Sequence, residues 1–155
     1  QMNRIEWKPE FEVGIGVIDV QHHRIVDYIN TLIESKGSTQ HQELALIIDS
    51  LIDYTYSHFA FEEALMEEAG YEFLTVHQQT HEAFTRRLNV LHKSFRDGMD
   101  VSDELVELLK TWLINHIMSD DQSYVAVVRE KFSVTDKMSD GGWFSKAYRR
   151  FFGEN

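Results

Sequence analysis

The chain lacks cysteine altogether, so it can form no disulfide, offers no thiolate to a metal ion and carries no cysteine nucleophile. Its only proline is Pro9, and the sequence after it is free of this helix breaker, which favours long helices. No apolar run approaches the roughly 18 to 20 residues that a membrane span requires. Because the N-terminus also lacks the charged and apolar regions of a signal peptide, we expect a cytoplasmic protein without a transmembrane segment.

Basic residues are scarce as well. The 155 residues include 15 Lys and Arg against 26 Asp and Glu, which gives a formal net charge of -11. A surface this acidic repels phosphate backbones, so we expect no nucleic-acid partner. The hydrophobic fraction of 43% is ordinary for a globular protein, and the length suits one domain with a sizeable core.

Apolar residues recur every three or four positions through four long segments, which predicts four amphipathic helices. The predicted helices span about residues 19–35, 40–68, 72–97 and 102–131. The first three are followed by Gly37, Gly70 and Gly98, where the glycine that ends a helix usually lies. Short connections between consecutive helices favour an all-α fold, an antiparallel up-and-down four-helix bundle.

Two segments lie outside the predicted bundle domain of residues 1–132. The apolar N-terminal loop around Trp7 and Phe11 is expected to pack across one end of the bundle. Residues 133–155 form a C-terminal extension or linker, in which 141–152 predict a short helix after a glycine hinge. Its aromatic residues recur every four positions beside Lys and Arg, so two roles stay open. In the first role, this helix packs on its own bundle. In the second, it docks to a signalling-protein partner, to a membrane surface or, by self-association, to a second copy.

Histidine interrupts the apolar stripe of every predicted helix. The interrupting residues are His22, then His58 with Glu62, then His77 with His81, then His116 with Asp120 or Asp121. In an antiparallel bundle these positions meet at one level inside the core. A single buried histidine is usually a hydrogen-bonded core residue, but a whole group with carboxylates needs charge compensation. The pattern therefore predicts a metal centre.

The spacings suit shared ligation, with one exception. Residues four apart share a helix face, as His58 and Glu62 do, and as His77 and His81 do. His116 and Asp121 are five apart, which separates them by roughly 140° on a regular helix. On a regular helix, Asp120 lies closer to the face of His116. A π-bulge would place Asp121 on that face instead. The residues alone leave both aspartates open.

Five histidines and two carboxylates exceed what one ion takes, so they suit two ions. Calcium and magnesium prefer oxygen ligands, and zinc often takes sulfur. Imidazole combined with carboxylate suits iron, with manganese or zinc as alternatives. Because most of these ligands are neutral, we expect reversible binding of dioxygen rather than oxygen-cleaving chemistry.

Four motifs in this order resemble the hemerythrin family, and within it the bacteriohemerythrins. They are Gly14-Ile15-Gly16 with Ile18-Asp19-Val20-Gln21-His22, then His58-Phe59-Ala60-Phe61-Glu62-Glu63, then His77-Gln78-Gln79-Thr80-His81, then Trp112-Leu113-Ile114-Asn115-His116-Ile117 through Asp121. The resemblance covers about residues 5–132. It implies a four-helix bundle that holds two non-haem iron ions.

The resemblance also implies a role for each ligand. One iron is expected on His77, His81 and His116, and the other on His22 and His58. Glu62 and Asp121 are expected to bridge them together with an oxo or hydroxo group, so the resemblance favours Asp121 over Asp120. Dioxygen is expected at the open position of the iron with two histidines.

The expected function is thus an oxygen carrier, store or sensor domain rather than an enzyme. The alternatives are a di-iron oxidase or peroxidase, a redox-sensing module of a larger signalling protein, and a structural bundle with zinc. No candidate general acid or base stands out beyond the ligands, which weakens the enzyme hypothesis. The other polar residues near the motifs are expected on the surface: His23, His41, His92, Glu63 and Glu67.

Overall fold

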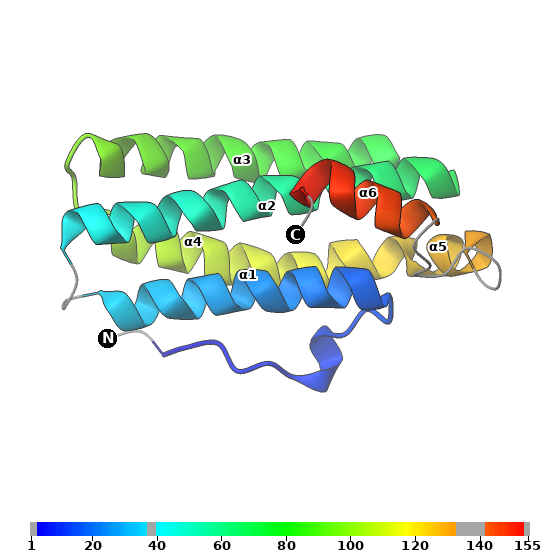
Figure 1. Cartoon of the computed structure of the whole chain (residues 1–155), viewed down its shortest axis with the longest axis horizontal. Helices are drawn as coiled ribbons and strands as arrows, with labels where there is room; N and C mark the ends of the chain where they lie inside the picture. The colour runs from blue at the N-terminus through cyan, green and yellow to red at the C-terminus, as the bar shows by residue number, and fades with distance from the viewer. Residues whose placement is uncertain (1–2, 37–39, 133–141, 154–155) are drawn as a thin grey trace.

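The computed structural model describes residues 3–36, 40–132 and 142–153, and all regular structure in these ranges is helical. The long helices are α1 (Gly16–Ser35), α2 (His41–Ala69), α3 (Leu74–Arg96) and α4 (Ser102–Asn115). Each packs against its neighbours in the chain, and α4 returns to α1, which closes a ring of four (Figure 1). The predicted all-α up-and-down bundle is confirmed.

The helix ends lie close to their predicted positions. Among the first three helices the largest difference is at α1, which begins at Gly16 rather than Asp19. Gly70 ends α2 in the left-handed conformation, with φ of 73°, and Gly98 adopts φ of 98° two residues after the end of α3. These values favour glycine because it has no Cβ to clash. Gly37, the third predicted stop, lies outside the described residues.

The fourth predicted helix is not one regular helix, and this is a correction to the predicted segment 102–131. After α4 the backbone widens into a π-helix, η2 (His116–Asp120). It then tightens into a 3-10 helix, η3 (Asp121–Tyr124), before α5 (Val125–Lys131) resumes the α-helical form. The π-bulge that one of the two aspartate alternatives required is therefore present, and it rotates every residue after His116 relative to a regular helix.

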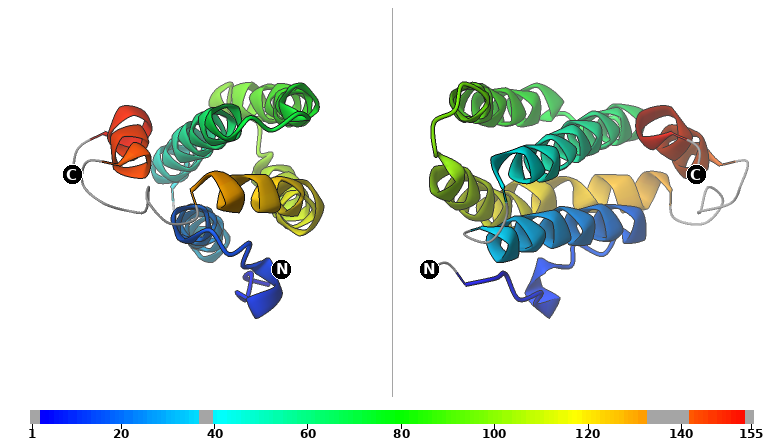
Figure 2. Two further views of the ribbon diagram at one scale, coloured as in Figure 1. Left: turned by 90° about the vertical axis from the view of Figure 1, so that its right-hand side faces the viewer. Right: turned by 60° about the vertical axis from the view of Figure 1, so that its left-hand side comes forward.

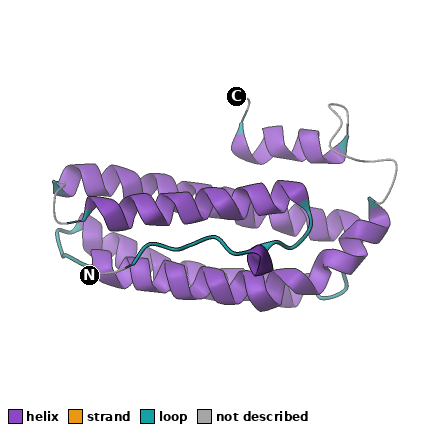
Figure 3. Ribbon diagram, turned by 90° about the horizontal axis from the view of Figure 1, so that it is seen from below, coloured by secondary structure: helices purple, strands orange, loops and turns teal. Residues whose placement is uncertain are grey.

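The N-terminal segment runs along the bundle rather than across its end, contrary to the prediction (Figure 3). It includes a short 3-10 helix, η1 (Pro9–Phe11). Near the start of α1, Asp19 accepts hydrogen bonds from the backbone N–H groups of Val13 and Gly14. Near the end of α1, the buried side chain of Asn30 exchanges two hydrogen bonds with the backbone of Ile5. An extended segment has no backbone partners of its own, and α1 supplies them along its length.

The predicted C-terminal helix is present as α6 (Trp143–Phe152). It lies outside the ring of four and packs on α2 (Figure 2). Phe144 and Ala147 are buried, so the expectation that this helix packs on its own bundle is confirmed. Gly141 of the predicted hinge lies outside the described residues, and the domain boundary at residue 132 stays a prediction. No helix in the described part of the chain combines the length and apolar character needed to cross a bilayer.

Candidate metal centre

The seven predicted donor residues come together in one buried cluster. They are His22 on α1, His58 and Glu62 on α2, His77 and His81 on α3, His116 at the start of η2 and Asp121 at the start of η3. None of them is more than 5% exposed. Residues from all sides of the ring thus meet at one level of the bundle, as the antiparallel arrangement led us to expect.

The donors form two groups that share one carboxylate. We term them the three-histidine group, which consists of Glu62, His77, His81 and His116, and the two-histidine group, which consists of His22, His58, Glu62 and Asp121. Within each group the donor atoms all lie within 4.8 Å of one another. Such mutual distances are compatible with a single ion per group, since ligand bonds of about 2 Å allow donors to be about 4 Å apart.

The two carboxylates each direct one oxygen toward each group. Oε1 of Glu62 lies 3.0 Å from Nε2 of His81, and its Oε2 lies 3.7 Å from Nε2 of His58. Oδ1 of Asp121 lies 2.7 Å from Nε2 of His116, and its Oδ2 lies 2.8 Å from Nε2 of His22. Both carboxylates are therefore placed to join the two groups.

The π-helix decides which of the two aspartates faces inward. With the widened turn between them, His116 and Asp121 lie side by side, and Asp121 is fully buried. Asp120 instead approaches the outer nitrogen of His116, with Oδ2 3.2 Å from Nδ1, and its side chain is 41% exposed. The structure thus brings Asp121 into the cluster and leaves Asp120 on its outer side.

The electrostatics of the cluster keep both carboxylates ionised and act in opposite directions on His58 and His77. Burial lowers the pKa of His58 to about 3, so its ring is neutral. Burial alone would raise the pKa of Glu62, but the surrounding histidines hold it well below its usual range. His77 shows the opposite balance: burial lowers its pKa, yet Asp121 and Glu62 raise it to about 9. The two buried carboxylates therefore demand positive charge, which protons or cations can supply.

Tyr124 contributes a contact that the sequence did not reveal. Its hydroxyl donates a 2.8 Å hydrogen bond to Oε2 of Glu62 inside the core. Burial and the charges of Glu62 and Asp121 raise the pKa of Tyr124 well above its usual value, so it remains a donor. In the sequence Tyr124 falls on the apolar stripe of the fourth segment, where an aromatic ring is expected and its hydroxyl carries no signal.

Two further residues bind the outer nitrogens of the histidines. Oε1 of Gln21 lies 2.7 Å from Nδ1 of His58, and Oε2 of Glu63 lies 2.7 Å from Nδ1 of His81. The prediction that Glu63 belongs to a purely solvated face is therefore wrong. Gln21 could have been suspected, because it is a polar residue between Ile18 and Ile25 on the buried side of α1.

Aromatic rings cover the three-histidine group. Phe59 stacks on His81 at 4.0 Å between ring centroids, and Trp112 stacks on His116 at 4.2 Å. Phe59 is buried and Trp112 is half-buried. This cover limits the access of water to the cluster and reduces the freedom of both imidazole rings.

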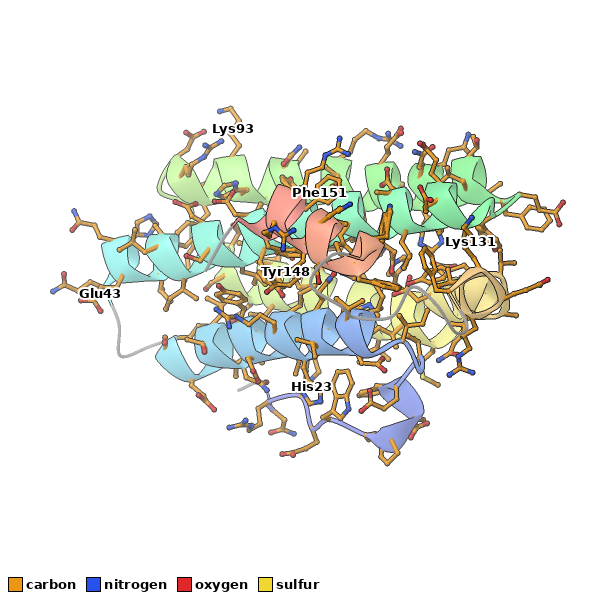
Figure 4. The ribbon with its side chains drawn as sticks, turned by 45° about the vertical axis from the view of Figure 1, so that its right-hand side comes forward. His23, Glu43, Lys93, Lys131, Tyr148 and Phe151 are labelled. Atoms are coloured by element: carbon orange, nitrogen blue, oxygen red, sulfur yellow. The ribbon has the colours of Figure 1, made fainter. Side chains whose placement is uncertain are left out.

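The remaining histidines lie away from the cluster. His23 is exposed and stacks on Trp7 of the N-terminal segment at 3.7 Å (Figure 4). His41 is exposed and stacks on Phe95 at the opposite end of the bundle. His92 is half-buried rather than fully exposed, and it pairs with Asp49 across α2 and α3. None of the three is placed to join either donor group.

Comparisons with known proteins agree on one family. The family model described as hemerythrin HHE cation binding domain matches residues 13–128. A bacteriohemerythrin of Pseudomonas aeruginosa (strain LESB58) is 49% identical over 154 residues, which cover 98% of this chain and 100% of that protein. A bacteriohemerythrin of Stenotrophomonas maltophilia (strain R551-3) is 42% identical over 153 residues, with the same coverage. The crystal structure of a wild-type hemerythrin superposes with a TM-score of 0.77 at 30% identity, covering 81% of this chain and 98% of that one.

Proposed function

This chain belongs to the hemerythrin family, and from that premise we propose that it holds two non-haem iron ions and binds dioxygen reversibly. The ligands would be the seven residues of the cluster, with His77, His81 and His116 on one ion and His22 and His58 on the other. Glu62 and Asp121 would bridge the pair. The observation that carries this assignment is that each of these buried carboxylates directs one oxygen toward each histidine group.

Unpaired polar atoms in the core support a metal in this position. Nε2 of His22, Nε2 of His58 and both carboxylate oxygens of Asp121 are buried and have no hydrogen-bond partner among the described residues. They lie close together, as the 2.8 Å between His22 and Asp121 shows, but their orientation does not suit hydrogen bonds to one another. Donor atoms that converge without pairing are typical of a coordination site, and imidazole with carboxylate suits iron.

The protein's own contribution is to fix the donors and to keep water out. Tyr124 holds the bridging oxygen of Glu62, and Gln21 holds the ring of His58 from its outer side. Because Nδ1 of His58 is engaged there, its Nε2 carries the lone pair that faces the cluster. Iron supplies the electrons that reversible dioxygen binding requires. Phe59 would exclude water from the site, together with Leu113 and Ile117, which are buried within one turn of His116.

The test combines metal analysis with spectroscopy. We expect about two iron ions per chain, and an absorption change on exposure of the reduced protein to air that reverses when oxygen is removed. A His58→Ala variant, which removes one donor, should lose both signals, whereas the exposed His23→Ala variant should keep them. A single ion, a preference for zinc when iron is in excess, or net consumption of oxygen would contradict the proposal. Net consumption would instead favour the oxidase or peroxidase alternative.

The ring contacts of Phe61 favour a sensor among the possible physiological roles. Phe61 lies next to Glu62 on α2, and its ring contacts Trp143, Phe151 and Phe152 of α6. A change in the position of Glu62 on oxygen binding would thus reach α6 through one residue. In the sensor role, limited proteolysis should cut α6 at different rates in the oxygenated and deoxygenated protein. Equal rates would leave the carrier or store role.

A further inference from the structure

The outer nitrogens of the cluster histidines have unequal partners. In the three-histidine group, Nδ1 of His81 lies 2.7 Å from the carboxylate of Glu63, and Nδ1 of His116 lies 3.2 Å from that of Asp120. In the two-histidine group, Nδ1 of His58 meets the neutral amide oxygen of Gln21. Nδ1 of His22 is buried and has no hydrogen-bond partner among the described residues. Among these four outer nitrogens, only the two in the three-histidine group have a carboxylate partner.

An amide and a carboxylate do different things to an imidazole. Either one accepts a hydrogen bond from Nδ1–H, which fixes the tautomer and the orientation of the ring. Only a carboxylate adds negative charge, and this makes Nε2 a better donor to a cation. Replacing such an outer partner in metalloproteins typically costs about 10- to 100-fold in metal affinity. The two groups should therefore differ by more than the number of their histidines.

The burial of these partners is consistent with the division of charge. The side chains of Glu63 and Asp120 are 28% and 41% exposed, so each carboxylate retains part of its hydration while it contacts a buried ring. Gln21 is fully buried, so a carboxylate in its place would lose its hydration entirely. Glu63 and Glu82 both line a groove of about 400 Å³ between α2 and α3, and it is Glu63 that contacts Nδ1 of His81.

We propose that Glu63 and Asp120 are positioning residues that act through His81 and His116. They make the three-histidine group the stronger of the two cation sites, so the first divalent cation enters there. The inference rests on the proposed function, since it assumes that both groups bind a metal. It also gives Asp120, the aspartate outside the cluster, a role of its own.

The experiment is a titration of the iron-free protein with Co²⁺, in which calorimetry and visible absorption monitor the binding. We expect two resolved binding steps in the wild-type protein. The Glu63→Gln variant keeps a hydrogen-bond acceptor at His81 but removes its charge, and it should weaken the first step about 10- to 100-fold. Asp120→Asn should act in the same direction at His116. The matched control is Glu82→Gln, which removes the same charge from the same groove and should leave both steps unchanged.

The outcomes separate this inference from the proposed function. If the wild-type protein fails to take up two Co²⁺ ions, the proposed metal centre itself is wrong. If it takes up two and Glu63→Gln changes neither step, or weakens the second step as much as the first, the inference is wrong. If Glu82→Gln weakened Co²⁺ binding as much as Glu63→Gln does, the effect would come from the net charge of the groove and not from the contact with His81. The inference would then also be wrong. In the iron-loaded protein, the carboxylate of Glu63 stabilises the ferric state more than the ferrous state. Glu63→Gln removes this negative charge and should therefore raise the reduction potential.

Discussion

The two halves of the bundle core are built by the same four helices and are buried to the same extent, yet their chemistry is opposite. The apolar half, far from the cluster, consists of residues such as Ile29, Leu32, Ile48, Leu51, Leu88, Leu105 and Leu109, none more than 3% exposed. The polar half contains the five histidines and two carboxylates of the cluster, and none of these is more than 5% exposed. Burial of apolar side chains stabilises the first half without any cofactor, whereas burial of charged groups destabilises the second unless a cation compensates them.

This difference shows how one fold separates stability from function. The apolar half keeps the helices in register, so the polar half can hold an arrangement of donors that would be unfavourable on its own. The outer partners Gln21, Glu63 and Asp120 occur only around the polar half, because only imidazole rings there need to be oriented. Experiments that act on one half at a time should therefore give distinct results.

Removal of the metal should have the largest effect on stability and should act on the polar half. An ion at a thousandfold excess over its dissociation constant stabilises a fold by about 4 kcal/mol. For a chain of this size, that corresponds to a fall in Tm of about 8 to 16 °C on chelation. Differential scanning calorimetry measures the change, and hydrogen exchange should rise more around the cluster than around Leu105. An unchanged Tm would contradict the proposed stabilising role of the metal.

The Asp121→Ala substitution should remove most of the bound iron, because it deletes one of the two carboxylates that are placed to join the histidine groups. Iron content per chain should fall to half of the wild-type value or less. Asp120→Ala is the matched comparison one residue away, and it should keep both ions when iron is in excess. If Asp120→Ala loses iron and Asp121→Ala keeps it, the ligand assignment in η2 and η3 is wrong.

A substitution in the apolar half should reverse this pattern. Leu105→Ala leaves a cavity at a fully buried position, and we expect it to lower the free energy of unfolding by about 3 kcal/mol. Its iron content should remain that of the wild-type protein. Denaturant titration measures the loss of stability, and Leu46→Ala at a position 69% exposed serves as the control. Loss of iron in Leu105→Ala would show that the two halves are not independent.

The smallest effect is expected in α6, which lies outside both halves. Phe144→Ala should lower the free energy of unfolding by about 2 kcal/mol, because the ring is 6% exposed but the helix can shift to fill the space. Iron content should not change, since no cluster residue lies on α6. Tyr148→Ala on the exposed side of the same helix is the control for stability (Figure 4). A stability loss as large as that of Leu105→Ala would make α6 part of the main core.

Most of the bundle could be predicted from the sequence because helix periodicity is a local property. The stripes around Ile25, Ile48 and Leu88 predicted three helices whose ends lie close to the observed ones. The path of the N-terminal segment could not be predicted in this way. That path depends on Asn30, whose side chain binds the backbone of Ile5. In the sequence, Asn30 is an ordinary polar residue of a helix, and nothing indicates this contact.

The identity of the donors was also a local property. Histidine and glutamate in positions that should be apolar stand out in any helical stripe, and their clustering follows from the antiparallel arrangement of the helices. The same reasoning left Asp120 and Asp121 open, because spacing on a regular helix favours the former. The resemblance to hemerythrins favoured Asp121, and it is Asp121 that η2 turns into the cluster.

The sequence by itself determined the helices, the level at which they meet and the chemistry of the groups that meet there, since each depends on residues a few positions apart. The tertiary structure decided the outer partners of His58 and His81, whereas the partner of His116, Asp120, lies only four positions away in the chain. Gln21 reaches His58 across 37 positions and Glu63 reaches His81 across 18. These contacts depend on how each helix is rotated about its axis against its neighbours, and that rotation is set by the packing of the whole core rather than by any local pattern.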